Sequence, residues 1–189
     1  MKILVVGLPK SGTTILTYRI AAALDDVTVE FEPSGGPDPD LAGSATDVVT
    51  KKLVGSQTTT LADYAHYDRR IWICRDPRDF LVSQTLYRWH REEAPTDVDR
   101  RCFEQALAAV LAKEADPANV AFATLEPADY SATFDAGAEL WEREGVDGGL
   151  LYPSEDMVAG EYRSLNRYLG FEVEPAASVA AGLERVARR

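Results

Sequence analysis

Short apolar runs alternate with segments of helical spacing along most of the chain. Runs of strand length occur at residues 2–6, 27–31, 47–54, 70–74 and 149–152. Segments that favour helices occur at residues 13–24, 58–67, 76–91, 97–113, 133–144, 160–169 and 175–186, most of them with apolar residues three or four positions apart. Apolar strands that alternate with helices predict an α/β fold, in which a central parallel sheet is covered by helices on both faces.

Two parts of the chain stand apart from this alternation. Residues 33–44 are rich in Gly, Pro and Asp, and they are expected to form a loop long enough to serve a function. Residues 114–131 match neither pattern. Because no internal repeat or clear linker is present, we expect a single three-layer sandwich domain over residues 1–189.

The helix expected at 76–91 has the clearest start signal. Asp76 is placed to cap the helix and Pro77 suits the first helical position. Asp79 stands where a capping box has its acidic residue. The helix should therefore begin directly after the fourth expected strand.

The chain carries a strong negative charge. It has 20 Lys and Arg residues against 31 Asp and Glu residues, which gives a formal net charge of −11 over 189 residues. This balance argues against a general nucleic-acid binder and against a polybasic membrane anchor. Any anionic ligand must be held by a local group of cations against an unfavourable overall field.

The patterns of cysteine, histidine and apolar residues argue against metal-binding, disulfide-rich, secreted and membrane-spanning proteins. Cys74 and Cys102 lie far apart, and His66 and His90 are too few for a histidine-rich site, so neither a metal site nor a disulfide framework is expected. The first apolar run is too short for a signal peptide or for a membrane span of about 20 residues. We expect a soluble, cytoplasmic protein with no membrane span.

The segment after the first expected strand has the layout of a phosphate-binding loop. Gly7 and Gly12 are separated by four residues, and Thr13 and Thr14 follow at the start of a helix. Backbone N–H groups and the positive end of that helix would together cradle an anion. A nucleotide triphosphatase has lysine directly after the second glycine, whereas this chain has Thr13 there and its lysine earlier, as Lys10. The alternative is a plain strand-to-helix turn.

Two motifs carry a resemblance to a known family. The sequence Pro-Lys-Ser-Gly-Thr-Thr at 9–14 resembles the 5′-phosphosulfate-binding loop of the PAPS-dependent sulfotransferases. The sequence Arg-Asp-Pro-Arg-Asp-Phe-Leu-Val-Ser at 75–83 is similar to the 3′-phosphate motif of that family. Arginine offers a planar fork that suits phosphate oxygens, and Ser83 lies about two helical turns along the helix that Pro77 opens. Alone, the second motif reads as a capped helix with surface arginines; the order of the two motifs makes the pair specific.

The resemblance extends over roughly residues 2–24, 48–91 and 149–171, a little over half of the chain. The last of these segments is similar to a late strand-and-helix element of the family and bears on fold more than on chemistry. The Arg-Lys-Gly cofactor motif that the family carries near its C-terminus is not found. A compact or divergent member of the family is the natural interpretation.

The resemblance implies transfer of a sulfuryl group from PAPS to a hydroxyl or amine, with PAP as the product and without a metal. The acceptor would be a small molecule or a glycan or lipid, and the sequence does not identify it. The residues that would bind the cofactor are Lys10, Ser11, Gly12, Thr13, Thr14, Arg75 and Ser83. The catalytic residues would be Lys10, Lys51 and Glu32.

Lys51 and Lys52 lie where the family often has a second catalytic lysine. Only one of them can face the site, because successive side chains of a strand alternate, and we prefer Lys51. The chain has only five lysines, which weakens the alternative of solvated lysines on an edge strand. The family's cytosolic members have a histidine just after this point, and this chain has none there.

Glu32 is the candidate general base because it follows the second expected strand at the edge where α/β sites form. Its alternative is a solvated loop carboxylate. Glu30 is expected on the opposite face, and His66 and His90 are expected to be structural or exposed.

Two other functions stay open at this stage. A P-loop kinase or nucleotide phosphotransferase would need lysine at position 13 and an acidic Mg²⁺ ligand after a strand; Asp76 has the second placement, but Thr13 does not fit the first. A non-catalytic nucleotide-binding module of the same fold is the alternative from another class.

Overall fold

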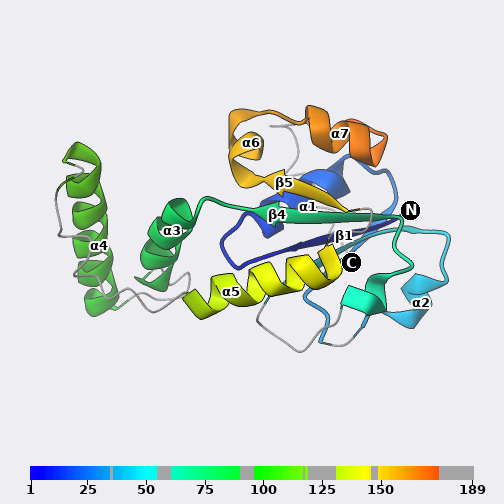
Figure 1. Ribbon diagram of the computed structural model, residues 1–189, viewed down its shortest axis with the longest axis horizontal. Helices are drawn as coiled ribbons and strands as arrows, with labels where there is room; N and C mark the ends of the chain where they lie inside the picture. Colours follow the sequence, from blue (N-terminus) through cyan, green and yellow to red (C-terminus); the bar gives the residue numbers. More distant parts are fainter. Residues whose placement is uncertain are drawn as a thin grey trace. The chain divides into compact units, whose positions relative to one another are not determined.

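The protein is described here from a computed structural model (Figure 1). The residues that it describes are 1–34, 36–54, 61–89, 96–116, 118, 131–145 and 149–174. They fall into two compact units, one formed by Met1–Arg75 with the residues from Ala132 onward, the other by Asp76–Ser131. The single domain expected over 1–189 remains a prediction.

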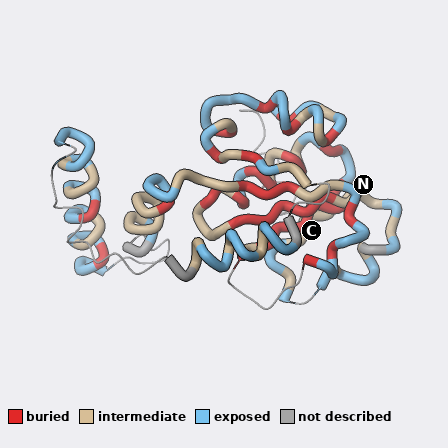
Figure 2. Tube along the Cα trace, viewed as in Figure 1, coloured by how far each residue is buried: buried red, intermediate tan, exposed pale blue. Residues whose placement is uncertain are grey.

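The first unit is built on a parallel sheet of five strands in the order β2-β3-β1-β4-β5. The strands are β1 (Lys2–Gly7), β2 (Val27–Phe31), β3 (Asp47–Leu53), β4 (Arg69–Cys74) and β5 (Leu150–Pro153). All neighbouring pairs are parallel. β1 lies at the centre and is almost wholly buried, as its run of apolar residues predicts (Figure 2). The α/β fold class is confirmed.

The register brings the ends of four strands to one edge of the sheet. Val5 in β1 pairs with Lys51 in β3 and with Ile71 in β4, and Lys51 in turn pairs with Phe31 in β2. In a parallel sheet the carboxyl ends all meet at the same edge, which is where α/β proteins bind ligands. The loop after β1, Glu32, the end of β3 and Arg75 therefore share that edge.

Each face of the sheet buries its own apolar cluster. On one face, Ile3, Val5 and Val49 pack with residues of α1 (Thr13–Ala22), α6 (Ser154–Ala159) and α7 (Arg163–Leu169). On the other, Leu4, Val6 and Trp72 pack with η1 (Leu61–Tyr64) and with the end of α5 (Ser131–Leu140). The helices on the two sides of the sheet are visible in Figure 1. Alternate residues of β1 thus supply both cores.

The second unit contains α3 (Pro77–Trp89) and α4 (Asp97–Ala115). The carboxylate of Asp76 accepts the N–H of Arg78 at 2.8 Å, which confirms the capping contact expected at the start of α3. α4 begins with a capping box, in which the hydroxyl of Thr96 and the carboxylate of Asp99 exchange bonds with each other's backbone N–H groups.

Several elements differ from the sequence prediction. The loop at 33–44 contains a short helix, α2 (Pro39–Ala42), and the helix expected at 58–67 is only the 3₁₀ turn η1 within the described residues. The helix expected at 160–169 begins at Arg163, because Gly160 has a φ of 79° and ends α6. α5 continues into a π-helical turn, η3 (Trp141–Gly145). The helix expected at 175–186 lies outside the described residues.

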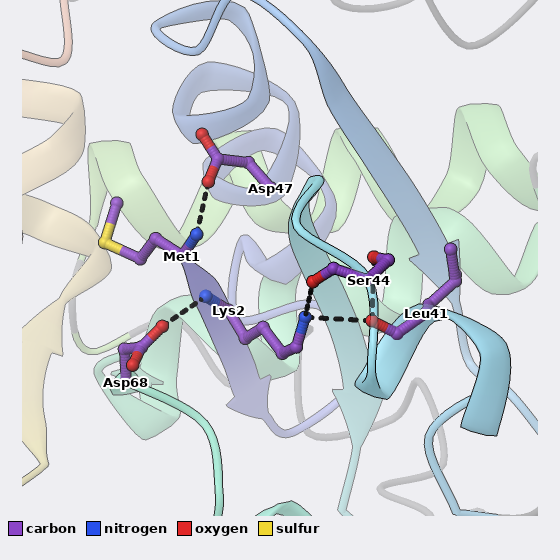
Figure 3. A network of polar contacts seen from close by, with 6 residues as sticks. All are labelled: Met1, Lys2, Leu41, Ser44, Asp47 and Asp68. Atoms are coloured by element: carbon purple, nitrogen blue, oxygen red, sulfur yellow. Dashed lines mark hydrogen bonds and ion pairs between the residues drawn. The ribbon is translucent and has the colours of Figure 1, made fainter.

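A polar network ties the start of β1 to the far end of the 33–44 segment (Figure 3). Lys2 donates from its ammonium to the carbonyls of Leu41 and Ser44 at 2.8 and 3.1 Å, and its N–H donates to Asp68 at 2.7 Å. The amino group of Met1 pairs with Asp47. These contacts anchor the segment where it returns to the sheet at β3.

Candidate anion-binding site

The loop between β1 and α1 turns sharply before the helix begins. The N–H and the hydroxyl of Ser11 both donate to the carbonyl of Leu8, at 3.2 and 2.7 Å, and they close the turn. Lys10 and Gly12 have positive φ angles of 64° and 94°. No side chain caps the first turn of α1, so its backbone N–H groups are available to an anion.

Glycine is required at both ends of this loop. A Cβ on Gly7 would lie 2.5 Å from the carbonyl oxygen of Ile73 and 2.7 Å from the hydroxyl of Ser11. A Cβ on Gly12 would lie 2.9 Å from the Cε of Met157, and its φ of 94° is one that L-residues rarely adopt. The spacing read from the sequence therefore has a steric cause, which is close packing of the loop against β4 and α6.

Arg75 holds the loop from the next strand. It follows β4, and its Nη1 donates to the carbonyl of Lys10 at 2.9 Å. The structure thus brings together two residues that the sequence predicts to bind the two ends of one ligand. The contact also fixes the peptide of Lys10, which is the residue in the loop with the least favoured backbone apart from glycine.

Lys51 and Glu32 form an ion pair on the face of the sheet that α1 covers. The Nζ of Lys51 lies 2.5 Å from Oε1 of Glu32, and the Glu32 N–H donates to the Lys51 carbonyl at 2.9 Å. The ammonium also lies over the ring of Phe31, 5.2 Å from its centroid. The Lys51 side chain is 8% exposed and that of Glu32 is 40% exposed, so the pair joins a buried ammonium to a carboxylate that reaches solvent.

Backbone strain is concentrated at two of the predicted catalytic residues. Among the described residues, Lys10 and Glu32 are the non-glycine residues with positive φ, at 64° and 47°. Such conformations cost roughly 1–3 kcal/mol each and persist where surrounding contacts enforce them. Arg75 supplies that contact at Lys10, and Lys51 supplies it at Glu32.

Lys52 points to the opposite face and contacts the beginning of the 33–44 segment. Its Nζ donates to the carbonyl of Pro33 at 2.6 Å. Burial lowers the pKa of Lys52, against the opposing effect of the carboxylates of Glu32, Asp63 and Glu30. Lys51 and Lys52 thus face opposite sides of β3, as alternation requires.

Glu30 belongs to a polar cluster on the Lys52 face. Its carboxylate accepts from Thr50 at 2.5 Å, from Tyr67 at 3.2 Å and from the N–H of Asp38 at 3.1 Å. Burial is the main cause that raises the pKa of Tyr67. Glu30 and Glu32 face opposite sides of the sheet. Strand alternation alone would put residues two apart on the same face, but the left-handed backbone of Glu32 turns its side chain to the other side.

Tyr64 lies beside this cluster with its ring 5.2 Å from that of Tyr67. Its hydroxyl is buried and has no hydrogen-bond partner. Burial and the charges of Glu30 and Asp63 raise its pKa to about 12. No sequence motif marks Thr50, Tyr64 or Tyr67. Alternation along β3 places Thr50 on the same face as Lys52, whereas its position opposite Glu30 depends on the register of β2 and β3.

The remaining predicted residues, Thr13, Thr14 and Ser83, lie in helices α1 and α3. Thr13 is buried at the start of α1, and its carbonyl accepts the hydroxyl of Thr17 at 2.8 Å, while Thr14 is exposed. Ser83 is half-buried in α3, in the second unit, so its pairing with Arg75 on one phosphate remains a prediction.

The described residues contain neither a metal-binding cluster nor a membrane-spanning helix. No group of three or more His, Cys, Asp or Glu side chains in the described part of the chain is arranged to hold a metal ion. Within the same ranges, no helix combines the length and the apolar character that crossing a bilayer demands.

The comparison with solved structures gives a clear result for the fold. No protein-family model matches the chain, and no curated protein matches it in sequence. Its structure is similar to that of mouse sulfotransferase SULT7A1 complexed with PAP, with a TM-score of 0.54 and 20% sequence identity. The similarity covers 99% of this chain and 62% of that one. The chain therefore has a sulfotransferase-like fold.

Proposed function

We propose that the protein transfers a sulfuryl group from PAPS to a hydroxyl or amine of an acceptor. The observation that carries the proposal is the loop after β1, in which Lys10 is held by Arg75 beside the uncapped N-terminus of α1. Three further features support it: the loop sequence, the position of Arg75 and the fold shared with a PAP-bound sulfotransferase.

The loop would bind the 5′-phosphosulfate of the donor. The N–H groups of Gly12, Thr13 and Thr14 would donate to its oxygens, with Ser11 shaping the turn and the positive end of α1 favouring negative charge. Arg75 uses Nη1 for the carbonyl of Lys10, and its remaining N–H groups would contact the 3′-phosphate with Ser83. The acidic chain thus holds an anion with a few placed cations and backbone dipoles.

The reaction would be an in-line displacement without a metal. The acceptor oxygen or nitrogen forms a bond to sulfur while the bond from sulfur to the 5′-phosphate oxygen breaks, and PAP leaves with the bonding electrons. Lys10 would stabilise the charge that builds on the leaving phosphate, and Glu32 would take the acceptor's proton. In the free protein Lys51 holds Glu32 through their ion pair.

The test is a calorimetric titration of the parent protein with PAP, ADP and ATP, each with and without Mg²⁺. The proposal predicts that PAP binds most tightly and that Mg²⁺ does not change its affinity. A preference for ATP with Mg²⁺ would instead identify a P-loop kinase or nucleotide phosphotransferase. Binding of PAP without transfer to any acceptor in a broad panel of alcohols, phenols and amines would favour a non-catalytic module.

A further inference from the structure

The Lys51–Glu32 pair lies beside α1, the helix that follows the anion-binding loop. Phe31, whose ring underlies the Lys51 ammonium, packs against Tyr18 of α1 with ring centroids 5.2 Å apart. Tyr18 is one turn beyond Thr14, a rise of about 6 Å along the helix axis. Lys51 also pairs with Val5, two residues before Gly7, where the loop begins. The ion pair therefore lies near the rim of the proposed donor site.

Lys51 has little room for a second anion while Glu32 is in place. Its side chain is 8% exposed, and its ammonium contacts both the Phe31 ring and the Glu32 carboxylate. An incoming phosphate or sulfate oxygen would have to share this buried ammonium with the carboxylate, and two like charges on one buried cation repel each other. We therefore expect an anion that binds Lys51 to take the place of the carboxylate.

Glu32 is placed to leave. Its side chain is 40% exposed, and its φ of 47° is sparsely populated for a residue other than glycine. Once the ammonium has another partner, the carboxylate can turn to solvent without being left buried and unpaired.

We propose that Glu32 blocks Lys51 in the free protein and that an anionic donor displaces it, exchanging the partner of Lys51. The proposal rests on the proposed function, because it takes the donor to be PAPS. Its consequence is an order of events: the carboxylate that would accept the acceptor's proton is released only when the donor is bound.

The exchange predicts that removing the negative charge of Glu32 strengthens donor binding. We would titrate PAP by calorimetry into the parent and into Glu32→Gln, with Glu30→Gln as the matched control. The control makes the same change two residues earlier, within β2 and on the opposite face, where the carboxylate contacts Thr50 and Tyr67. Glu32→Gln should raise the affinity by about fivefold or more, the low end of the range by which one bound ligand changes the affinity for another, whereas Glu30→Gln should not.

A third variant makes the test specific for Lys51. Lys51→Met keeps an apolar stem of similar length and should weaken PAP binding, and Glu32→Gln added to Lys51→Met should then give no gain. Circular dichroism and the thermal midpoint confirm that each variant is folded. An equal affinity of parent and Glu32→Gln, or a gain that persists without Lys51, overturns the exchange while leaving the proposed function in place. Failure of PAP to bind the parent overturns both.

Discussion

The guanidinium of Arg75 donates to the backbone carbonyl of Lys10 at 2.9 Å, across 65 positions of sequence. One residue follows β4 and the other lies in the loop after β1, and these strands are neighbours in the sheet. The contact supports the φ of 64° at Lys10 and so helps to position this lysine. Arg75 is also the residue that we propose for the 3′-phosphate. The two ends of the proposed donor site are thus linked before any ligand binds.

Replacing Arg75 should therefore weaken donor binding through both ends of the site. We expect Arg75→Ala to lower PAP affinity by about tenfold to a hundredfold, the range for losing a hydrogen bond to a charged group. The PAP affinity of Arg75→Lys should lie between those of the parent and Arg75→Ala, since lysine keeps the charge and loses the planar fork. Calorimetry with PAP gives the affinities. Arg78→Ala is the control, because Arg78 is exposed and pairs with Asp76; equal losses in the two alanine variants would contradict the account.

Lys10→Ala separates binding from chemistry. If Lys10 stabilises the leaving phosphate, its loss should lower the transfer rate more than PAP affinity, because the stabilised charge exists mainly in the transition state. A fall of about a hundredfold or more in kcat is expected, the size seen when one preorganised stabilising group is removed. Lys113→Ala, an exposed lysine of α4, is the control. Transfer at the parent rate in Lys10→Ala would remove Lys10 from the mechanism.

Gly7→Ala tests the steric basis of the loop. The added methyl group would lie 2.5 Å from the backbone oxygen of Ile73, which cannot move without disturbing β4. We expect the free energy of unfolding to fall by about 1–3 kcal/mol, as for overpacked sites. Gly43→Ala is a matched control, because its nearest atom is 4.0 Å away and its φ is −89°. Urea unfolding measures both; a Gly7 variant as stable as the Gly43 variant would be inconsistent with the packing described.

The contribution of Asp76 to the stability of the folded protein should decrease at acid pH. Hydrogen bonds from Arg78 lower the pKa of Asp76 to about 2 from an ordinary value of 3.8. A carboxylate with a lowered pKa in the folded state stabilises it fully above the unfolded value, and this contribution is lost as the pH falls toward 2. Asp76→Asn keeps a capping side chain but removes the charge. Its difference from the parent in thermal midpoint should therefore be largest near about pH 5 and shrink near about pH 2.5; a constant difference would rule out this ion pair as its cause.

The sequence predicts the architecture well because strand alternation and helical spacing are local. All five strands occur where apolar runs predict them, and the start of α3 follows from Asp76 and Pro77. The division of residues 154–169 into α6 and α7 escaped prediction, because the left-handed conformation of Gly160 is set by how the chain turns between two packed helices. Periodicity does not report such a turn.

Within the site, residue types were easier to predict than their partners. The loop after β1 and Arg75 were predicted from motifs, whereas the bond from Arg75 to the Lys10 carbonyl depends on β1 and β4 being neighbours. The pairing of Lys51 with Glu32 likewise depends on the register of β2 and β3 and on a left-handed residue after β2. Neither relationship leaves a pattern in the sequence.

A crystal structure with PAP bound would decide whether the loop after β1 is a donor site. The 5′-phosphate should lie within hydrogen-bond distance of the N–H groups of residues 12–14 and of the Lys10 ammonium, with the 3′-phosphate on Arg75. A crystal grown with excess PAP in which the nucleotide lies elsewhere, or in which this loop holds no phosphate, would contradict it.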